Sequence, residues 1–257
     1  MKKYKLIGTL FSALKRIKPK RVYASAIILA AGSGTRMGGA VTKQWLDIGG
    51  IPTVVRSLLA FNASKSIKEI ILCVKKDELH RYDGIKEKYG IKKLKKIVPG
   101  GETRQLSALE GFKNISNKAG YVAVHDAARC LITPEMIEKT VRAAVINGCA
   151  VAASRATDTV KLVNSRLLVT DTPERSTVWL AATPQVFETE IYRASAYVAL
   201  KDKITVTDDA SMAEHAGFAV KLVDTGKENM KITTPEDVYI AEAILKMRST
   251  VFADEKQ

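Results

Sequence analysis

Two cations follow a glycine-rich turn near the start of the chain. The turn begins after the apolar run 26–31, and the cations are Arg36 and Lys43. Small residues let successive backbone N–H groups point into one concavity, which binds an anion. Arg36 can form two parallel hydrogen bonds with phosphate oxygens, and Lys43 adds a point charge. The segment 26–44 therefore predicts a polyphosphate-binding loop; the alternative is a tight turn with two solvated cations.

The spacing of these glycines fits neither of the two common phosphate motifs. The pattern G-x-x-x-x-G-K-[ST] is absent, and in GSGTRMG (32–38) the third glycine comes one position too late for G-x-G-x-x-G. A nicotinamide-dependent dehydrogenase is therefore disfavoured.

A second glycine pair follows the apolar run 96–98. Gly100 and Gly101 permit close approach of the backbone to a ligand, and Ser107 can meet a base, a ribose or a phosphate. The alternative is a helix entry with Thr103 near its cap.

An acidic residue follows the next apolar run, 121–124. Asp126 can bind Mg²⁺, a ribose or substrate hydroxyls, because Mg²⁺ is usually held by one or two carboxylates together with substrate phosphates. The alternative is a buried carboxylate that caps the following turn. His125 is interpreted as structural, and the three histidines make no metal-ligand spacing.

Further cations and hydroxyls lie later in the chain. They are Arg129, Arg175, Thr183, Thr207 and Lys231. Each has an alternative on its own, such as a helix cap for Thr207 or a surface charge for Arg175 and Lys231. Together with Arg36 and Lys43, the cations suffice for two phosphate groups of different origin.

Strand-like apolar runs alternate with helical patterns along the chain. The runs lie at 25–31, 69–74, 96–98, 121–125, 149–154 and 219–222. The helical patterns lie at 52–63, 77–89, 103–114, 134–147, 188–200, 208–215 and 235–247. This order predicts an α/β fold with a Rossmann-like, mostly parallel sheet covered by helices on both faces. Ligands of such sheets bind at the carboxyl ends of the strands, where the polar residues above are expected.

One segment, 155–178, breaks the alternation. Strand-like stretches at 159–163 and 167–170 are joined at 164–165, which predicts a β-hairpin arm that projects from the domain. A projecting ribbon with one apolar face needs a partner, and exchange of the arm in a homodimer would supply it. The alternative is an arm folded back on its own subunit.

Composition limits the class of protein. The net charge is +14, of which residues 1–21 carry eight cations and no acid, leaving +6 on residues 22–257. The leader lacks a cleavage site and is interpreted as a loosely docked extension or a basic segment on an anionic membrane surface. The three cysteines are typical of reduced thiols in the cytoplasm. No motif points to nucleic-acid binding.

The motifs together resemble the 2-C-methyl-D-erythritol 4-phosphate cytidylyltransferase family. The matching blocks, in family order, are LAAGSGTRMG, KQ at 43–44, GGETRQ, VHDAAR, DTVK, TPQVF, TDDAS and NMKITTPED. The sequence departs from the family pattern at Thr42, Leu106 and Cys130. The resemblance divides the chain into a basic extension (1–24), a nucleotidyltransferase domain (25–248) with its dimerisation arm (155–178), and a tail (249–257).

The resemblance implies transfer of CMP from CTP to methylerythritol 4-phosphate with Mg²⁺ and release of pyrophosphate. The catalytic residues it implies are Arg36, Lys43 and Lys231. The nucleotide site it implies consists of Ala30, Ala31, Gly32, Ser33, Gly34, Gly101, Glu102, Ser107 and Asp126. The acceptor site it implies consists of Asp126, Arg129, Thr159, Arg175, Thr183, Thr207 and Lys231. The alternatives are a ribitol 5-phosphate cytidylyltransferase and a non-catalytic basic binding module.

Overall fold

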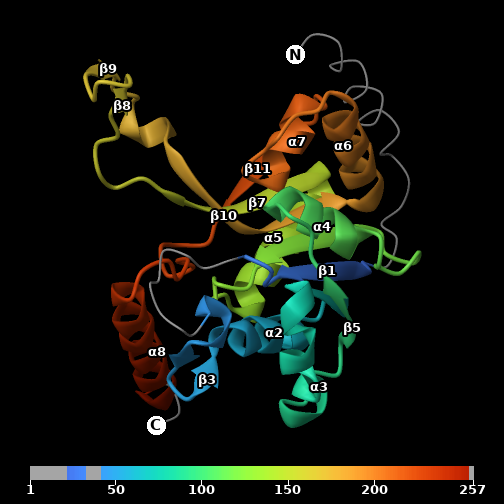
Figure 1. Cartoon of the computed structure of the whole chain (residues 1–257). Helices are drawn as coiled ribbons and strands as arrows, with labels where there is room; N and C mark the ends of the chain where they lie inside the picture. The colour runs from blue at the N-terminus through green and yellow to red at the C-terminus, as the bar shows by residue number, and fades with distance from the viewer. Residues whose placement is uncertain (1–21, 33–41, 255–257) are drawn as a thin grey trace.

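The computed structural model describes residues 22–32 and 42–254. The expected basic extension at 1–24 therefore lies, apart from its last three residues, outside the described part of the chain. The described part forms a seven-stranded sheet with helices on both faces (Figure 1). The predicted α/β class, with a mostly parallel sheet and a projecting hairpin, is confirmed.

The main sheet places strands from both halves of the chain side by side. Its order is β11-β7-β10-β6-β1-β4-β5. Its strands are β1 (Ala24–Leu29), β4 (Ile67–Val74), β5 (Leu94–Pro99), β6 (Tyr121–Asp126), β7 (Cys149–Arg155), β10 (Trp179–Glu188) and β11 (Lys221–Asp224). Neighbours are parallel except β10, which runs antiparallel to β6 and β7. The carboxyl ends of β1, β5 and β6 consequently meet at one edge.

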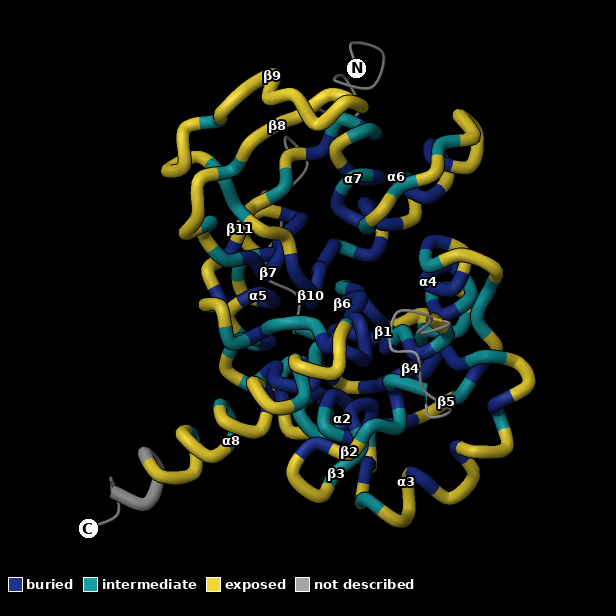
Figure 2. Tube along the Cα trace, turned by 60° about the vertical axis from the view of Figure 1, so that its left-hand side comes forward, coloured by how far each residue is buried: buried dark blue, intermediate teal, exposed yellow. Residues whose placement is uncertain are grey.

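Two layers of helices bury the sheet. The helices of these layers are α2 (Thr53–Ala63), α3 (Ile85–Lys88), α4 (Arg104–Phe112), α5 (Pro134–Asn147), α6 (Thr189–Lys201) and α7 (Asp209–His215). A further helix, α8 (Glu236–Asp254), packs away from the main sheet. Side chains alternate between the faces of a strand. Ile28 of β1 therefore packs in one apolar cluster with α2 and α5, and Ile27 packs in the other with α4, α6 and α7. Figure 2 shows the strands at the centre of the sheet buried, in dark blue, whereas most of the described part of α8 is exposed, in yellow.

Helix α4 lies close against β1. The Thr103 hydroxyl caps it by accepting a hydrogen bond from the Leu106 N–H at 3.1 Å. Near its other end, a Cβ added to Gly111 would lie 2.3 Å from Cγ2 of Ile27. Only glycine permits this approach, which fixes the helix whose first turn carries Arg104 and Ser107.

Smaller elements join these layers. Within the described residues, the 3₁₀ helices are η3 (Lys43–Trp45), η4 (Lys76–Tyr82) and η5 (Arg175–Thr177). A two-stranded sheet, β2 (Asp47–Ile48) and β3 (Ile51–Pro52), packs with α8 in a third apolar cluster. No helix in the described ranges is long and apolar enough to cross a membrane.

Two sequence predictions of elements need correction, and one strand was not predicted. The continuous helix at 77–89 is wrong, because Gly84 adopts a φ of +71° and separates η4 from α3. The run at 219–222 begins two residues too early, because β11 spans Lys221–Asp224. Residues 249–254 of the expected tail continue α8. The long strand β10 was not expected: its sequence is interrupted by Pro184, which a shift in register between Ala181 and Gln185 accommodates.

The predicted arm is present at 155–178. Strands β8 (Leu162–Val163) and β9 (Val169–Asp171) pair antiparallel and are shorter than expected. The arm projects from the end of β7 and returns into β10 (Figure 1). Its large apolar side chains are exposed, with Leu167 at 80% and Leu168 at 60%.

Candidate active site

A pocket of about 310 Å³ opens at the carboxyl ends of β1, β5 and β6. Its walls are formed by the ends of those strands, by the first turn of α4, and by the segments that carry Lys43 and Lys231. The lining residues are Leu29, Ala31, Gly32, Lys43, Gln44, Gly101, Glu102, Thr103, Arg104, Ser107, Asp126, Ala128 and Lys231. This is the edge at which parallel α/β sheets bind ligands.

Most residues predicted to bind the nucleotide or to act in catalysis line this pocket. They are Ala31, Gly32, Lys43, Gly101, Glu102, Ser107, Asp126 and Lys231. Ala30 does not line it, because it is buried and its N–H donates to the Cys73 carbonyl at 2.7 Å. The predicted residues Ser33, Gly34 and Arg36 lie outside the described residues.

The glycine pair after β5 forms one wall of the pocket. A Cβ on Gly100 would lie 2.6 Å from Cβ of Ala31, and a Cβ on Gly101 would lie 2.5 Å from Cβ of Leu106. The Ser107 hydroxyl accepts from the Gly101 N–H at 3.1 Å and lies 2.9 Å from the Thr103 carbonyl. The two glycines therefore lead into α4 and also form a pocket wall in which the backbone itself is accessible to a ligand.

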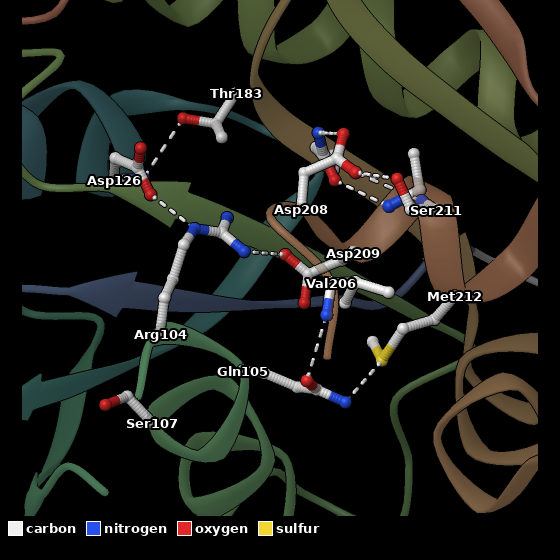
Figure 3. Close-up of polar contacts among 12 residues, drawn as sticks. Arg104, Gln105, Ser107, Asp126, Thr183, Val206, Asp208, Asp209, Ser211 and Met212 are labelled. Carbon is white, nitrogen blue, oxygen red and sulfur yellow. Dashed lines mark hydrogen bonds and ion pairs between the residues drawn. The ribbon is translucent and has the colours of Figure 1, made fainter. Parts of the chain in front are cut away.

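Asp126 lies between two cations. Its Oδ2 accepts from Nζ of Lys231 at 2.8 Å. Its Oδ1 accepts from Nε of Arg104 at 3.1 Å, as Figure 3 shows. Burial alone would raise the pKa of Asp126, but the attraction of Arg104 and Lys231 outweighs it, so the pKa lies well below its usual range. At neutral pH the pocket thus holds a fixed negative charge flanked by two positive ones.

Thr183 of β10 forms a hydrogen bond with the backbone of Asp126. Its hydroxyl accepts from the Asp126 N–H at 3.0 Å and lies 3.0 Å from Nδ1 of His125. His125 is fully buried, and burial lowers its pKa to about 3, so the ring is neutral. Asn229 donates to the Thr183 carbonyl at 2.8 Å, which joins β10 to the segment that carries Lys231. Thr183 is therefore placed to orient the Asp126 backbone.

The remaining predicted acceptor residues lie away from the pocket walls. Arg129 donates from Nη1 to the Asn229 carbonyl at 2.8 Å. Thr207 is exposed just before α7, and the helix cap is Asp208, whose Oδ1 accepts from the Ser211 N–H at 3.1 Å. The hypothesis that Thr207 caps this helix is therefore wrong.

Two predicted residues lie on the arm. Thr159 and Arg175 are both exposed, and Nη1 of Arg175 donates to the Thr157 carbonyl at 3.3 Å. Because the arm projects from the body (Figure 1), this chain does not bring them to its own pocket.

Three residues at the site were not given a role from the sequence. Gln44 donates from Nε2 to the Gly32 carbonyl at 3.0 Å and so joins η3 to the end of β1. Arg104 lines the pocket and contacts Asp126, and Asp209 pairs with Arg104. All three belong to motifs noted in the sequence, KQ, GGETRQ and TDDAS, and this was the available signal.

The donor set limits how a metal could be held. No group of three or more His, Cys, Asp or Glu side chains able to bind a metal occurs within residues 22–32 and 42–254. Asp126 has two oxygens with about four lone-pair sites, of which two accept from Arg104 and Lys231. Asp126 thus fits the role of one oxygen ligand to Mg²⁺, with substrate phosphates and water supplying the others.

Comparison with known proteins agrees with this geometry. The sequence model of the 2-C-methyl-D-erythritol 4-phosphate cytidylyltransferase family matches residues 24–247. A protein of that name from Alkaliphilus metalliredigens is 40% identical over 226 residues, covering 87% of this chain and 93% of the relative. One from Pelotomaculum thermopropionicum is 39% identical, covering 90% and 97%.

Solved structures of the same family have the same fold as this chain. The 4-diphosphocytidyl-2C-methyl-D-erythritol synthase of Anaerococcus prevotii superposes with a TM-score of 0.78 at 33% identity, covering 88% of this chain and 100% of that one. The 2-C-methyl-D-erythritol 4-phosphate cytidylyltransferase of Thermus thermophilus superposes with a TM-score of 0.71 at 26% identity, covering 86% and 98%. With its pocket, its motifs and these relatives in agreement, the chain belongs to the 2-C-methyl-D-erythritol 4-phosphate cytidylyltransferase family.

Proposed function

We propose that the chain transfers the CMP group of CTP to 2-C-methyl-D-erythritol 4-phosphate, giving CDP-methylerythritol and pyrophosphate in isoprenoid biosynthesis. The observation that carries this proposal is the pocket in which Lys43 and Lys231 face a wall of glycine backbone beside the ionised Asp126. Such a pocket suits two phosphate-bearing ligands, and family membership supplies their identity.

The reaction requires positioning and charge stabilisation and needs no covalent enzyme intermediate. An acceptor phosphate oxygen attacks the α-phosphorus in line, so its bond to phosphorus forms as the bond to pyrophosphate breaks. We assign Lys43, with Arg36, to the negative charge that develops on the α-phosphate and the departing pyrophosphate. We assign Lys231 to the attacking phosphate, and the backbone at Gly32 and Gly101 to the nucleotide.

We also propose that the reaction uses Mg²⁺. Asp126 would supply one ligand and the phosphates of CTP the others, and the ion would add positive charge where the phosphates come together. Asp126 is suited to this because its pKa is held well below its usual range.

Pyrophosphate release tests the function. With CTP and Mg²⁺, the purified protein is expected to release pyrophosphate with methylerythritol 4-phosphate much faster than with ribitol 5-phosphate. Preference for ribitol 5-phosphate would keep the chemistry and change the acceptor. Release with neither would contradict the proposal and leave a basic binding protein.

We propose that the working enzyme is a homodimer in which each arm reaches the other subunit. Leu162, Val163, Leu167, Leu168 and Val169 are all exposed large apolar side chains on one short hairpin. A hairpin this small does not bury them by itself, and a second copy would. The exposed Thr159 and Arg175 on the same arm would then complete the acceptor site of the partner.

Mixing two variants with different defects tests the exchanged arm, when activity is assayed at an acceptor concentration far below the KM of Arg175→Ala. Arg175→Ala is expected to raise the KM for the acceptor strongly, and Lys43→Ala to abolish most turnover. If the arms exchange, a mixed dimer carries both defects at one site and none at the other. Co-refolded equal amounts should then recover up to about a quarter of wild-type activity, the statistical limit for exchange between two subunits. Absence of recovery, with dimers present, would place each arm on its own subunit.

We propose that the enzyme works in the cytoplasm. Cys73, Cys130 and Cys149 are buried cysteines that form no disulfide with one another, and burial raises the pKa of Cys73 to about 12 and that of Cys130 to about 11. Cysteines that form no disulfide are typical of a reducing compartment.

A further inference from the structure

Arg104 lies between two carboxylates from different elements. Its Nε donates to Oδ1 of Asp126 at 3.1 Å, and its Nη1 donates to Oδ2 of Asp209 at 2.7 Å (Figure 3). The donors of a guanidinium form a rigid planar fork, so two such contacts fix both its position and its plane. The end of β6 and the start of α7 together hold Arg104 in place.

Asp209 is the more deeply buried of the two carboxylates. Its side chain is 1% exposed, compared with 12% for Asp126, and it does not line the pocket. Its Oδ1 accepts a hydrogen bond from the Tyr192 hydroxyl at 3.1 Å. Burying a carboxylate at this depth costs free energy unless the charge is paired. The ion pair with Arg104 therefore stabilises Asp209 in its buried position.

The neighbouring residue, Gln105, attaches the same helical turn to the same distant segment. Its Oε1 accepts from the Val206 N–H at 3.4 Å, and its Nε2 donates to the Ile204 carbonyl at 3.4 Å. The first turn of α4 is therefore joined to segment 204–209 at both ends of that segment. Thr207, an expected acceptor residue, lies between the two attachments.

Asp126 divides its oxygens between a more buried and a more exposed cation. The Arg104 side chain is 25% exposed and that of Lys231 is 35% exposed. A lysine on a flexible stem can turn toward a substrate phosphate, whereas a guanidinium held on two sides cannot. When Lys231 turns away, Arg104 still compensates the charge of Asp126, provided that something other than Asp126 holds it.

We propose that Asp209 is a positioning residue: it holds Arg104 against Asp126 and thereby couples segment 204–209 to the pocket. The inference rests on the proposed function in treating Lys231 as a group that binds substrate phosphate. Asp209 acts only through Arg104, so the two form one unit. Loss of either member releases the guanidinium and the segment together.

A double-mutant cycle tests whether the two residues act as a unit. Arg104→Lys keeps the charge and loses the fork, and Asp209→Asn keeps the shape and loses the charge. Each is expected to lower kcat/KM for the acceptor at saturating CTP by about tenfold, within the range for residues in one ion-pair network. The kcat/KM of the double variant should be no lower than that of the more impaired single variant, because the second substitution removes no further interaction.

Tyr192→Phe is the matched control. It removes the hydroxyl that donates to Asp209 and leaves the ion pair with Arg104 intact. It should lower the free energy of unfolding in urea without changing the KM for the acceptor. If Asp209→Asn behaves in the same way as Tyr192→Phe, or if the losses of the two single variants multiply, the proposal is wrong.

A measurement without turnover separates this proposal from the proposed function. In ¹⁵N NMR spectra, the Nε–H signal of Arg104 is identified by its disappearance in Arg104→Lys. It should be sharp and slow to exchange with water in the wild-type protein and in Tyr192→Phe, and lost to exchange in Asp209→Asn. An unchanged signal in Asp209→Asn would overturn the proposal, even in a protein that turns over CTP. A wild-type protein inactive with both acceptors would instead contradict only the proposed function.

Discussion

Replacing Lys43 with alanine should lower kcat by about 10²- to 10³-fold while changing the Kd for CTP far less. Lys43 lies in the pocket wall close to Gly32, with Cε 4.0 Å from the point where a Cβ on that glycine would lie. A cation at this place stabilises the charge that develops as pyrophosphate departs, which is largest in the transition state and smaller in bound CTP. Removing it therefore affects turnover more than binding.

Steady-state pyrophosphate release gives kcat for this variant, and calorimetry gives the Kd for CTP. Lys113→Ala is a suitable control, because Lys113 is exposed and pairs with Glu110 on the outside of α4. A large rise in Kd with an unchanged kcat would move Lys43 from catalysis to ground-state binding.

Replacing Asp126 with asparagine should affect both stability and activity. The amide keeps the shape of the carboxylate but leaves Arg104 and Lys231 beside each other without their shared counter-charge. Removing one partner of a buried ion pair costs about 3–5 kcal/mol of unfolding free energy, and we expect a value near the lower end because the pocket is open to water. Turnover should fall by about 100-fold, since Lys231 and the oxygen ligand are displaced together.

The pH dependence of unfolding checks the origin of this loss. The pKa of Asp126 in the folded protein lies below its unfolded value, so its stabilisation is present above about pH 4 and is lost as the pH falls through and below that value. The difference in unfolding free energy between wild type and Asp126→Asn should therefore be largest at neutral pH and decrease toward pH 3. Glu102→Gln, at an exposed carboxylate in the same pocket, should leave stability unchanged. A difference in unfolding free energy that does not depend on pH would show that the variant loses packing and not a charge interaction.

The sequence was sufficient for the parts of the site that follow single strands. Asp126 and Gly101 lie within three residues of the ends of apolar runs, so their place at the carboxyl edge follows from the α/β pattern alone. The bridge from Asp126 through Arg104 to Asp209 could not be predicted in this way. Asp209 lies 105 positions after Arg104, and the two meet only because α4 and α7 cover the same face of the sheet.

Strand β10 shows a different limit of pattern reading. Its run of Ala, Thr, Pro and Gln lacks the continuous apolar character of the parallel strands, and its bulge serves to admit Pro184. Likewise, the periodicity at 77–89 fits a helix, but the positive φ of Gly84 ends one element and starts another. The apolar pattern was too weak to reveal β10, and the backbone conformation of one glycine divided the segment 77–89.

The position of β10 in the sheet has a consequence for the chain as it is synthesised. β7 pairs only with β10 and β11, so it has no partner strand while the ribosome is still making the arm. Until residue 188 has emerged, the nascent protein can assemble only the four strands β5, β4, β1 and β6, with β6 as an open edge. Open edges of this kind invite pairing with other chains. The arm thus lengthens the interval during which a growing polypeptide must avoid its neighbours.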